Sequence, residues 1–152
     1  HVHARFSEEA LLQLKAQYPN AKVLAHPECK QSILQHADVI GSTQALLNYA
    51  IANSSLEHPI SNSEASHIQY IIATESGILH EMQKACPEVE FIAVPAVMDD
   101  MTICQCNECE YMRMCSLENL RNCLREEFGE ILVDDTVAKD AIKPIQRMLE
   151  MS

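Results

Sequence analysis

The residues best suited to chemistry gather in one short segment of the chain. Residues 104–115 read CQCNECEYMRMC and hold four of its seven cysteines. Thiolates bind zinc and iron–sulfur clusters far better than they bind hard cations. The spacing of Cys104, Cys106 and Cys109 therefore indicates soft-metal binding, although a redox disulfide would use the same residues.

A structural zinc ion would need four ligands, as two pairs or as cysteine and histidine together. The sequence offers no second close pair of cysteines, so His26 and Cys29 would have to complete the site. A cluster shared with residues outside this chain is the other interpretation. Cys29, Cys86 and Cys123 are expected to pack in the core, the last on a helical face with several leucines.

Two further groups could bind or convert a substrate. His26 and Glu28 follow a predicted strand, where both could face one side as a base or a hydrogen-bonding pair. Ser42 and Thr43 follow a glycine at the start of a predicted helix. Hydroxyls and backbone N–H groups in that place either bind phosphate or carboxylate or simply cap the helix. His3 has no interpretation from spacing alone.

Strands and helices are expected to alternate along the chain. Strands are predicted at residues 21–26, 68–75 and 90–95, and a strand followed by a turn at residues 38–42. Helices are predicted at residues 8–18, 30–36, 43–52, 76–85 and 116–128, with a broken helix around Pro144. The sequence thus predicts an α/β fold with a small parallel sheet of about four strands flanked by helices.

The reactive residues follow the predicted strands. His26, Ser42 and Thr74 stand at the ends of the first three predicted strands, and the cysteine segment lies in the loop behind the fourth. In parallel sheets the ligand site lies beyond the carboxyl ends of the strands, so these residues are expected to meet at one edge. Residues 53–67 are polar and predict a surface loop instead.

Length and charge narrow the class of protein. We expect a single α/β domain over residues 1–152, with closing helices toward the C-terminus. A net charge of −11 argues against nucleic-acid binding, which needs clustered Lys and Arg. The apolar runs are too short to span a membrane, and no signal sequence is visible. Clustered cysteines fit a reduced intracellular protein better than a secreted disulfide scaffold.

Five segments together resemble a known family. In order along the chain they read VHARF, YPNAKVLAHPEC, ADVIGSTQAL, IIATESGIL and CNECEYMRMCSLENL. The chain thereby resembles quinolinate synthase, the iron–sulfur enzyme of NAD biosynthesis, nearly from end to end. That family folds as three similar α/β domains around a central site, with a 4Fe–4S cluster held by one cysteine from each. This chain is similar to the C-terminal portion of such an enzyme, with its third domain.

The resemblance implies how the cysteines are used. Cys109 matches the third ligand of the 4Fe–4S cluster. The second ligand would stand just ahead of His1, outside this chain. Cys104 and Cys106 match accessory cysteines that are suspected of forming a regulatory redox disulfide.

The resemblance also implies a reaction and its site. His3, His26 and Glu28 match active-site positions, and Ser42 and Thr43 match a site for a substrate carboxylate or phosphate. The reaction would condense iminoaspartate with dihydroxyacetone phosphate to quinolinate, with loss of phosphate and water. The partners would be these substrates, the remaining domains of the enzyme and a second copy in a homodimer. The compartment would be the cytoplasm, or a plastid in a plant or alga.

A chain without the other cluster ligands is expected to be inactive alone. Two alternatives to the enzyme stay open. One is a non-catalytic zinc- or cluster-binding module that uses Cys104, Cys106, Cys109 and Cys115. The other is a redox switch whose thiols form only disulfides.

Overall fold

The computed structural model describes residues 1–54, 68–97, 103–104, 107–127 and 129–151. The chain divides into two compact units, His1–Arg113 and Met114–Ser152, each of which is described by itself. The expected surface loop at 53–67 lies outside the described residues from residue 55 onward. The expectation of a single domain over residues 1–152 stays a prediction.

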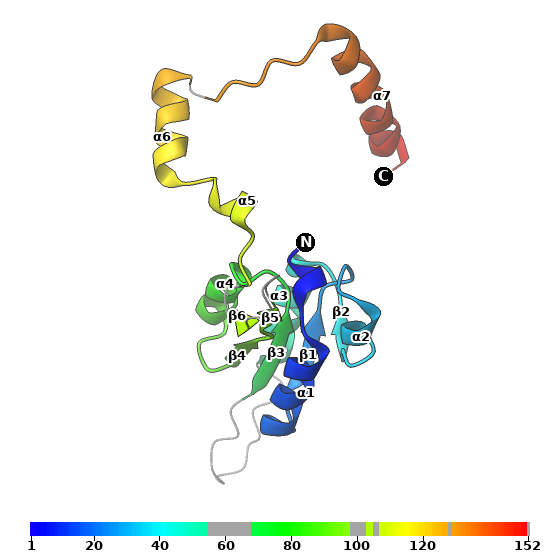
Figure 1. Cartoon of the computed structure of the whole chain (residues 1–152), viewed down its shortest axis with the longest axis vertical. Coiled ribbons are helices and arrows are strands. Elements are labelled where there is room, and N and C mark those ends of the chain that lie inside the picture. The colour runs from blue at the N-terminus through cyan, green and yellow to red at the C-terminus, as the bar shows by residue number, and fades with distance from the viewer. Residues whose placement is uncertain (55–67, 98–102, 105–106, 128, 152) are drawn as a thin grey trace. The chain divides into compact units, whose positions relative to one another are not determined.

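The first unit is built on a parallel sheet (Figure 1). Its strands are β1 (Lys22–Ala25), β2 (Val39–Ile40), β3 (Gln69–Ala73) and β4 (Glu90–Ala93), in the order β2-β1-β3-β4. Every neighbouring pair in this sheet is parallel, and the register sets Ala25 of β1 opposite Ala73 of β3. The predicted α/β fold with a small parallel sheet is therefore confirmed.

Helices cover both faces of this sheet. Residues of α1 (Glu8–Gln17) and α2 (Gln31–Leu34) join a core cluster on one face, and residues of α3 (Thr43–Ser54) and α4 (Ile78–Ala85) join another. Successive strand residues point to opposite faces. Val23 and Ile71 accordingly lie in the first cluster, while Leu24 and Ile72 lie in the second. Burial on both faces explains why these strands read as continuous apolar runs.

The N-terminal segment is anchored beside the sheet. A short 3-10 helix, η1 (His3–Arg5), stands between Val2 and Phe6, which are both buried in the first cluster. Phe6 forms an antiparallel bridge with Ala96 of β5 (Ala96–Val97), and β5 pairs with β6 (Ile103–Cys104). The β5–β6 pair was not predicted from the sequence. These contacts fix where η1, and with it His3, lies.

The last element of the first unit is α5 (Glu110–Arg113). The second unit contains α6 (Leu117–Glu126) and α7 (Asp135–Met151). Ser116 caps α6 by accepting a hydrogen bond from the Asn119 N–H at 3.1 Å. Helix α7 continues through Pro144, so the predicted break is wrong. Proline removes one backbone donor, and on an exposed helix water can satisfy the carbonyl that is left over.

Three cysteines were predicted to be buried in the core, and two of them are. Cys29 and Cys86 are buried, as expected. Cys123 does share an apolar face of α6 with Leu117 and Leu120, but all three side chains are exposed. The predicted burial of Cys123 is therefore wrong for the second unit taken by itself, because no described residue of that unit covers this face. None of the described helices is long and apolar enough to cross a membrane.

The packing of the sheet can be tested at Ile71. Ile71→Ala should lower the free energy of unfolding by about 2–5 kcal/mol, because the substitution leaves a cavity in the first core cluster. Leu12→Ala, at a position 46% exposed on α1, is the matched control and should change stability by no more than about 0.5 kcal/mol. Urea unfolding followed by circular dichroism measures both. Equal effects of the two substitutions would contradict the described core.

Candidate active site

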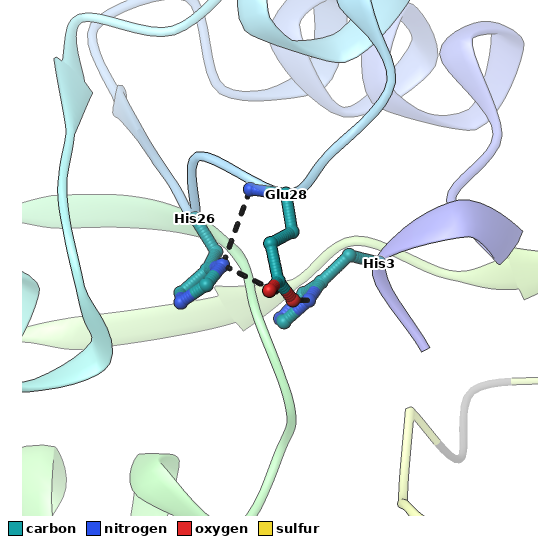
Figure 2. A group of neighbouring side chains, drawn as sticks. All are labelled: His3, His26 and Glu28. Carbon is teal, nitrogen blue, oxygen red and sulfur yellow. Dashed lines mark hydrogen bonds and ion pairs between the residues drawn. The ribbon is translucent and has the colours of Figure 1, made fainter. Parts of the chain in front are cut away.

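Three polar side chains converge at the carboxyl edge of the sheet (Figure 2). Glu28 Oε2 lies 3.2 Å from His3 Nδ1 and 4.0 Å from His26 Nδ1. The two imidazole rings are stacked, with centroids 4.2 Å apart and planes 6° from parallel. The histidine side chains are mostly buried, whereas that of Glu28 is 73% exposed. The structure thus brings together all three residues predicted to be catalytic.

A tight turn, rather than an extended strand, sets the geometry of His26 and Glu28. His26 follows β1 directly, and its N–H donates to the Ala73 carbonyl at 3.0 Å. The chain then turns at residues 27–28, and the Cys29 N–H returns to the His26 carbonyl at 3.0 Å. Within the turn the Glu28 N–H donates to His26 Nδ1 at 3.3 Å. The neutral His26 ring therefore carries its proton on Nε2.

Hydroxyl groups extend the site across two more strands. His3 Nε2 lies 3.3 Å from the Thr74 hydroxyl, which lies 3.5 Å from the hydroxyl of Thr43. Thr74 follows β3 and is 1% exposed, and Thr43 begins α3 after β2. Ser42 uses its hydroxyl to cap α3, accepting a hydrogen bond from the Ala45 N–H at 3.3 Å. The predicted meeting of the strand ends is therefore present for β1, β2 and β3.

The environment of His3 favours its neutral form. Burial, and after it the nearby His26, lowers the pKa of His3, while the hydrogen bond and charge of Glu28 offset part of the shift. With Nδ1 donating to the Glu28 carboxylate, Nε2 accepts a hydrogen bond from the Thr74 hydroxyl. A neutral imidazole held in one tautomer between a carboxylate and a hydroxyl is suited to moving protons.

The cysteine segment is only partly described. Cys109 is a free, half-buried thiol that packs against the first core cluster. The side chain of Cys104 and the whole of Cys106 lie outside the described residues, so the possible redox pair stays a prediction. Cys115 is free and exposed, and it belongs to the second unit.

Cys29 is chemically unlike Cys109. It is 5% exposed, and its thiol donates to the Ala73 carbonyl at 3.3 Å. Burial raises the pKa of the Cys29 thiol to about 11. Its thiol is engaged by the Ala73 carbonyl, and among the described residues Cys29 belongs to no group that could hold a metal ion, which argues against a zinc site completed by His26 and Cys29.

Within the described part of the chain, one group of residues could hold a metal ion, and it contains no cysteine. Its members are His3, His26 and Glu28, whose ligand atoms all lie within 4.8 Å of one another. Nδ1 of each ring, however, already has a hydrogen-bond partner on Glu28, the carboxylate for His3 and the backbone N–H for His26. The group is therefore arranged for hydrogen bonding and proton transfer.

The structure gives Thr74 and Glu75 contacts that the sequence did not predict. Thr74 links His3 to Thr43, and Glu75 accepts a hydrogen bond from the backbone of Cys109. The signal in the sequence was their position at the end of the predicted strand 68–75. Their partners come from distant parts of the chain, which periodicity and local spacing do not pair.

The pKa of His3 can be tested directly by NMR titration of its ring proton. It should lie below 6.5 and rise in His26→Ala, which removes a neighbouring ring and admits water, but fall further in Glu28→Gln. His80→Ala, at an exposed position of α4, should leave it unchanged. A His3 pKa above 6.5, or one unmoved by either substitution, would contradict this electrostatic description.

The same shift links His3 to stability. The folded state binds fewer protons than the unfolded state between the lowered pKa and the ordinary value of 6.5. The contribution of neutral His3 to the free energy of unfolding is therefore fully present above pH 6.5. It is lost as the pH falls from 6.5 to the lowered pKa of His3.

Comparison with known proteins identifies the family. A family model described as quinolinate synthetase A protein matches residues 1–150. The quinolinate synthase of Microcystis aeruginosa is 47% identical over 151 residues, covering 99% of this chain and 42% of the relative. That of Thermosynechococcus vestitus is 48% identical, covering 99% of this chain and 43% of the relative, and that of Chloroherpeton thalassium is 44% identical, covering 100% and 42%. The chain thus spans about 42% of the length of such relatives. It belongs to the quinolinate synthase family.

Proposed function

We propose that this chain forms part of a quinolinate synthase that condenses iminoaspartate with dihydroxyacetone phosphate. The observation that carries the proposal is the meeting of His3, His26 and Glu28 at the carboxyl edge of the sheet, in a chain of this family. Both substrates are anions, and making an aromatic acid from them requires proton transfers at several atoms. The two histidines can donate hydrogen bonds to anionic substrates, and together with the carboxylate they can transfer protons.

His3 and Glu28 would move a proton as a pair. Neutral His3 donates from Nδ1 to the Glu28 carboxylate, so a proton that reaches Nε2 through the Thr74 hydroxyl bound there is stabilised by the negative charge on the other side of the ring. Thr74 Oγ1, 3.3 Å from Nε2, holds the ring in this orientation. His26 Nδ1 is occupied by the Glu28 N–H, which leaves Nε2–H to donate to a substrate oxygen.

The start of α3 would bind a carboxylate or phosphate. The first N–H groups of a helix have no partner within the helix, and they attract anions. The Thr43 hydroxyl stands at this position, within 3.5 Å of Thr74 in the proton-transfer site. Since Ser42 already caps the helix, Thr43 is the better placed of the two hydroxyls to contact a substrate.

Cys109 would contribute one ligand to a 4Fe–4S cluster. It is a half-buried thiol without a disulfide, and a thiolate is the ligand that iron–sulfur clusters take. When bound, the cluster would supply a Lewis-acidic iron with an open position that polarises a substrate oxygen. The other ligands, and the partner copy of a homodimer, would come from outside this chain.

The role of Cys109 can be tested in the full-length protein. Cys109→Ser should abolish the iron–sulfur absorbance and the turnover after anaerobic reconstitution, because serine replaces a soft thiolate ligand. Cys123→Ser, at an exposed position of α6, is the matched control and should keep both. A Cys109→Ser protein with normal absorbance and turnover would refute the ligand assignment.

The proton-transfer site can be tested at Glu28. Glu28→Gln should lower kcat by a factor of about 10²–10⁴, because the amide removes the charge that stabilises a protonated His3. The iron content should stay normal. Glu9→Gln is the matched control. It also removes one negative charge, but at an exposed position of α1 outside the site, and it should leave kcat unchanged. Full activity of Glu28→Gln would exclude its carboxylate from the chemistry.

A further inference from the structure

Glu75 connects the end of β3 to the cysteine segment. It follows Thr74 at the carboxyl end of β3 and is half-buried. Both carboxylate oxygens accept hydrogen bonds from backbone N–H groups. Oε2 accepts one from Gly77 at 2.8 Å, and Oε1 accepts one from Cys109 at 3.3 Å. The side chain thus links the turn between β3 and α4 to the backbone of Cys109.

The same turn holds the cysteine segment at a second point. The Ser76 N–H donates to the Asn107 carbonyl at 3.0 Å. Asn107 is 1% exposed, and its side-chain amide donates to the carbonyl of Val94. Asn107 therefore anchors the segment to Val94 and to the turn after β3, while Glu75 acts on the backbone of Cys109 itself.

We propose that Glu75 is a positioning residue that holds Cys109 in the orientation required to bind a metal cluster. The inference rests on the ligand role proposed for Cys109. A ligand on a loop binds tightly only when hydrogen bonds around it limit its motion. A bond to an ionised carboxylate is about twice as strong as a neutral one, and this bond engages the Cys109 backbone while leaving the thiol free.

Gly77 makes room for the Glu75 carboxylate. A Cβ atom at position 77 would lie 2.7 Å from Glu75 Oε2, well inside van der Waals contact. The backbone of Gly77, the residue before the first of α4, has φ −58° and ψ −27°, which alanine adopts without strain. Gly77→Ala should therefore displace the carboxylate without changing its charge.

Glu75→Gln tests the same contact in another way. A glutamine amide presents one oxygen, so it can accept from only one of the two N–H groups at Gly77 and Cys109. Its NH₂ group would then face the other N–H. Glu81→Gln is the matched control, since it removes one charge at an exposed position of α4.

The variants are compared in the full-length protein by two measurements. The first is amide hydrogen exchange over residues 107–113 without a cluster. The second is the rate at which a chelator removes iron after anaerobic reconstitution. We expect exchange to be about tenfold faster in Glu75→Gln and Gly77→Ala than in Glu81→Gln, with β3 exchange unchanged. Iron loss should also be about tenfold faster. If the free energy of unfolding stays unchanged, a general structural defect does not explain this faster loss.

Three outcomes decide the proposal. Exchange and iron loss at control rates in both variants would overturn it. Faster exchange with unchanged iron loss would also overturn it, because Glu75 would then order the segment without positioning a ligand. If Glu75→Gln fails to fold, Gly77→Ala decides. A Cys109→Ser protein that keeps its iron would refute the proposed function as well, whereas loss of iron there with control behaviour in the variants would refute this inference alone.

Discussion

The parallel pairing of β1 with β3 is the constraint on which the candidate site depends. Ala25 and Ala73 are partners in this pairing, and the His26 N–H continues the ladder by donating to the Ala73 carbonyl at 3.0 Å. His26 and Thr74 therefore leave the sheet side by side. A slip of one residue would turn every side chain of a strand to the opposite face, and burial of both faces opposes such a slip strongly.

His3 reaches this site by a different route, because it belongs to no strand. The burial of Val2 and Phe6, together with the bridge from Phe6 to Ala96, holds η1 where its histidine can stack on His26. Two charged imidazoles at this separation would repel each other in a partly buried site. Burial favours the neutral form of His3 and the nearby His26 adds to this effect, while the hydrogen bond and charge of Glu28 offset part of the lowered pKa.

The surroundings of Cys29 and Cys109 in the structure distinguish their chemical properties better than their spacing in the sequence does. Cys29 is buried, donates to a backbone carbonyl and has a raised pKa, so it remains a thiol. Cys109 is free and half-buried, and its backbone is tied to the end of β3 through Glu75. In one chain the same side chain thus serves packing at one position and is available for ligation at another. The local field and solvent exposure decide between the two.

Much of the architecture follows from local patterns in the chain. Short apolar runs that alternate with amphipathic segments were enough to predict the parallel sheet, its helices and the edge where His26, Thr43 and Thr74 gather. Such patterns are local, and a parallel sheet brings the residues after its strands to one edge whatever the details of packing. The turn that joins His26 to Glu28, the stacking of His3, the exposure of Cys123 and the hydrogen bond from Cys109 to Glu75 were not predicted. The stacking of His3 and the bond from Cys109 to Glu75 join residues that are distant in the chain, and the His26–Glu28 turn and the exposure of Cys123 depend on three-dimensional geometry that residue types alone do not fix, so only the tertiary structure decided them.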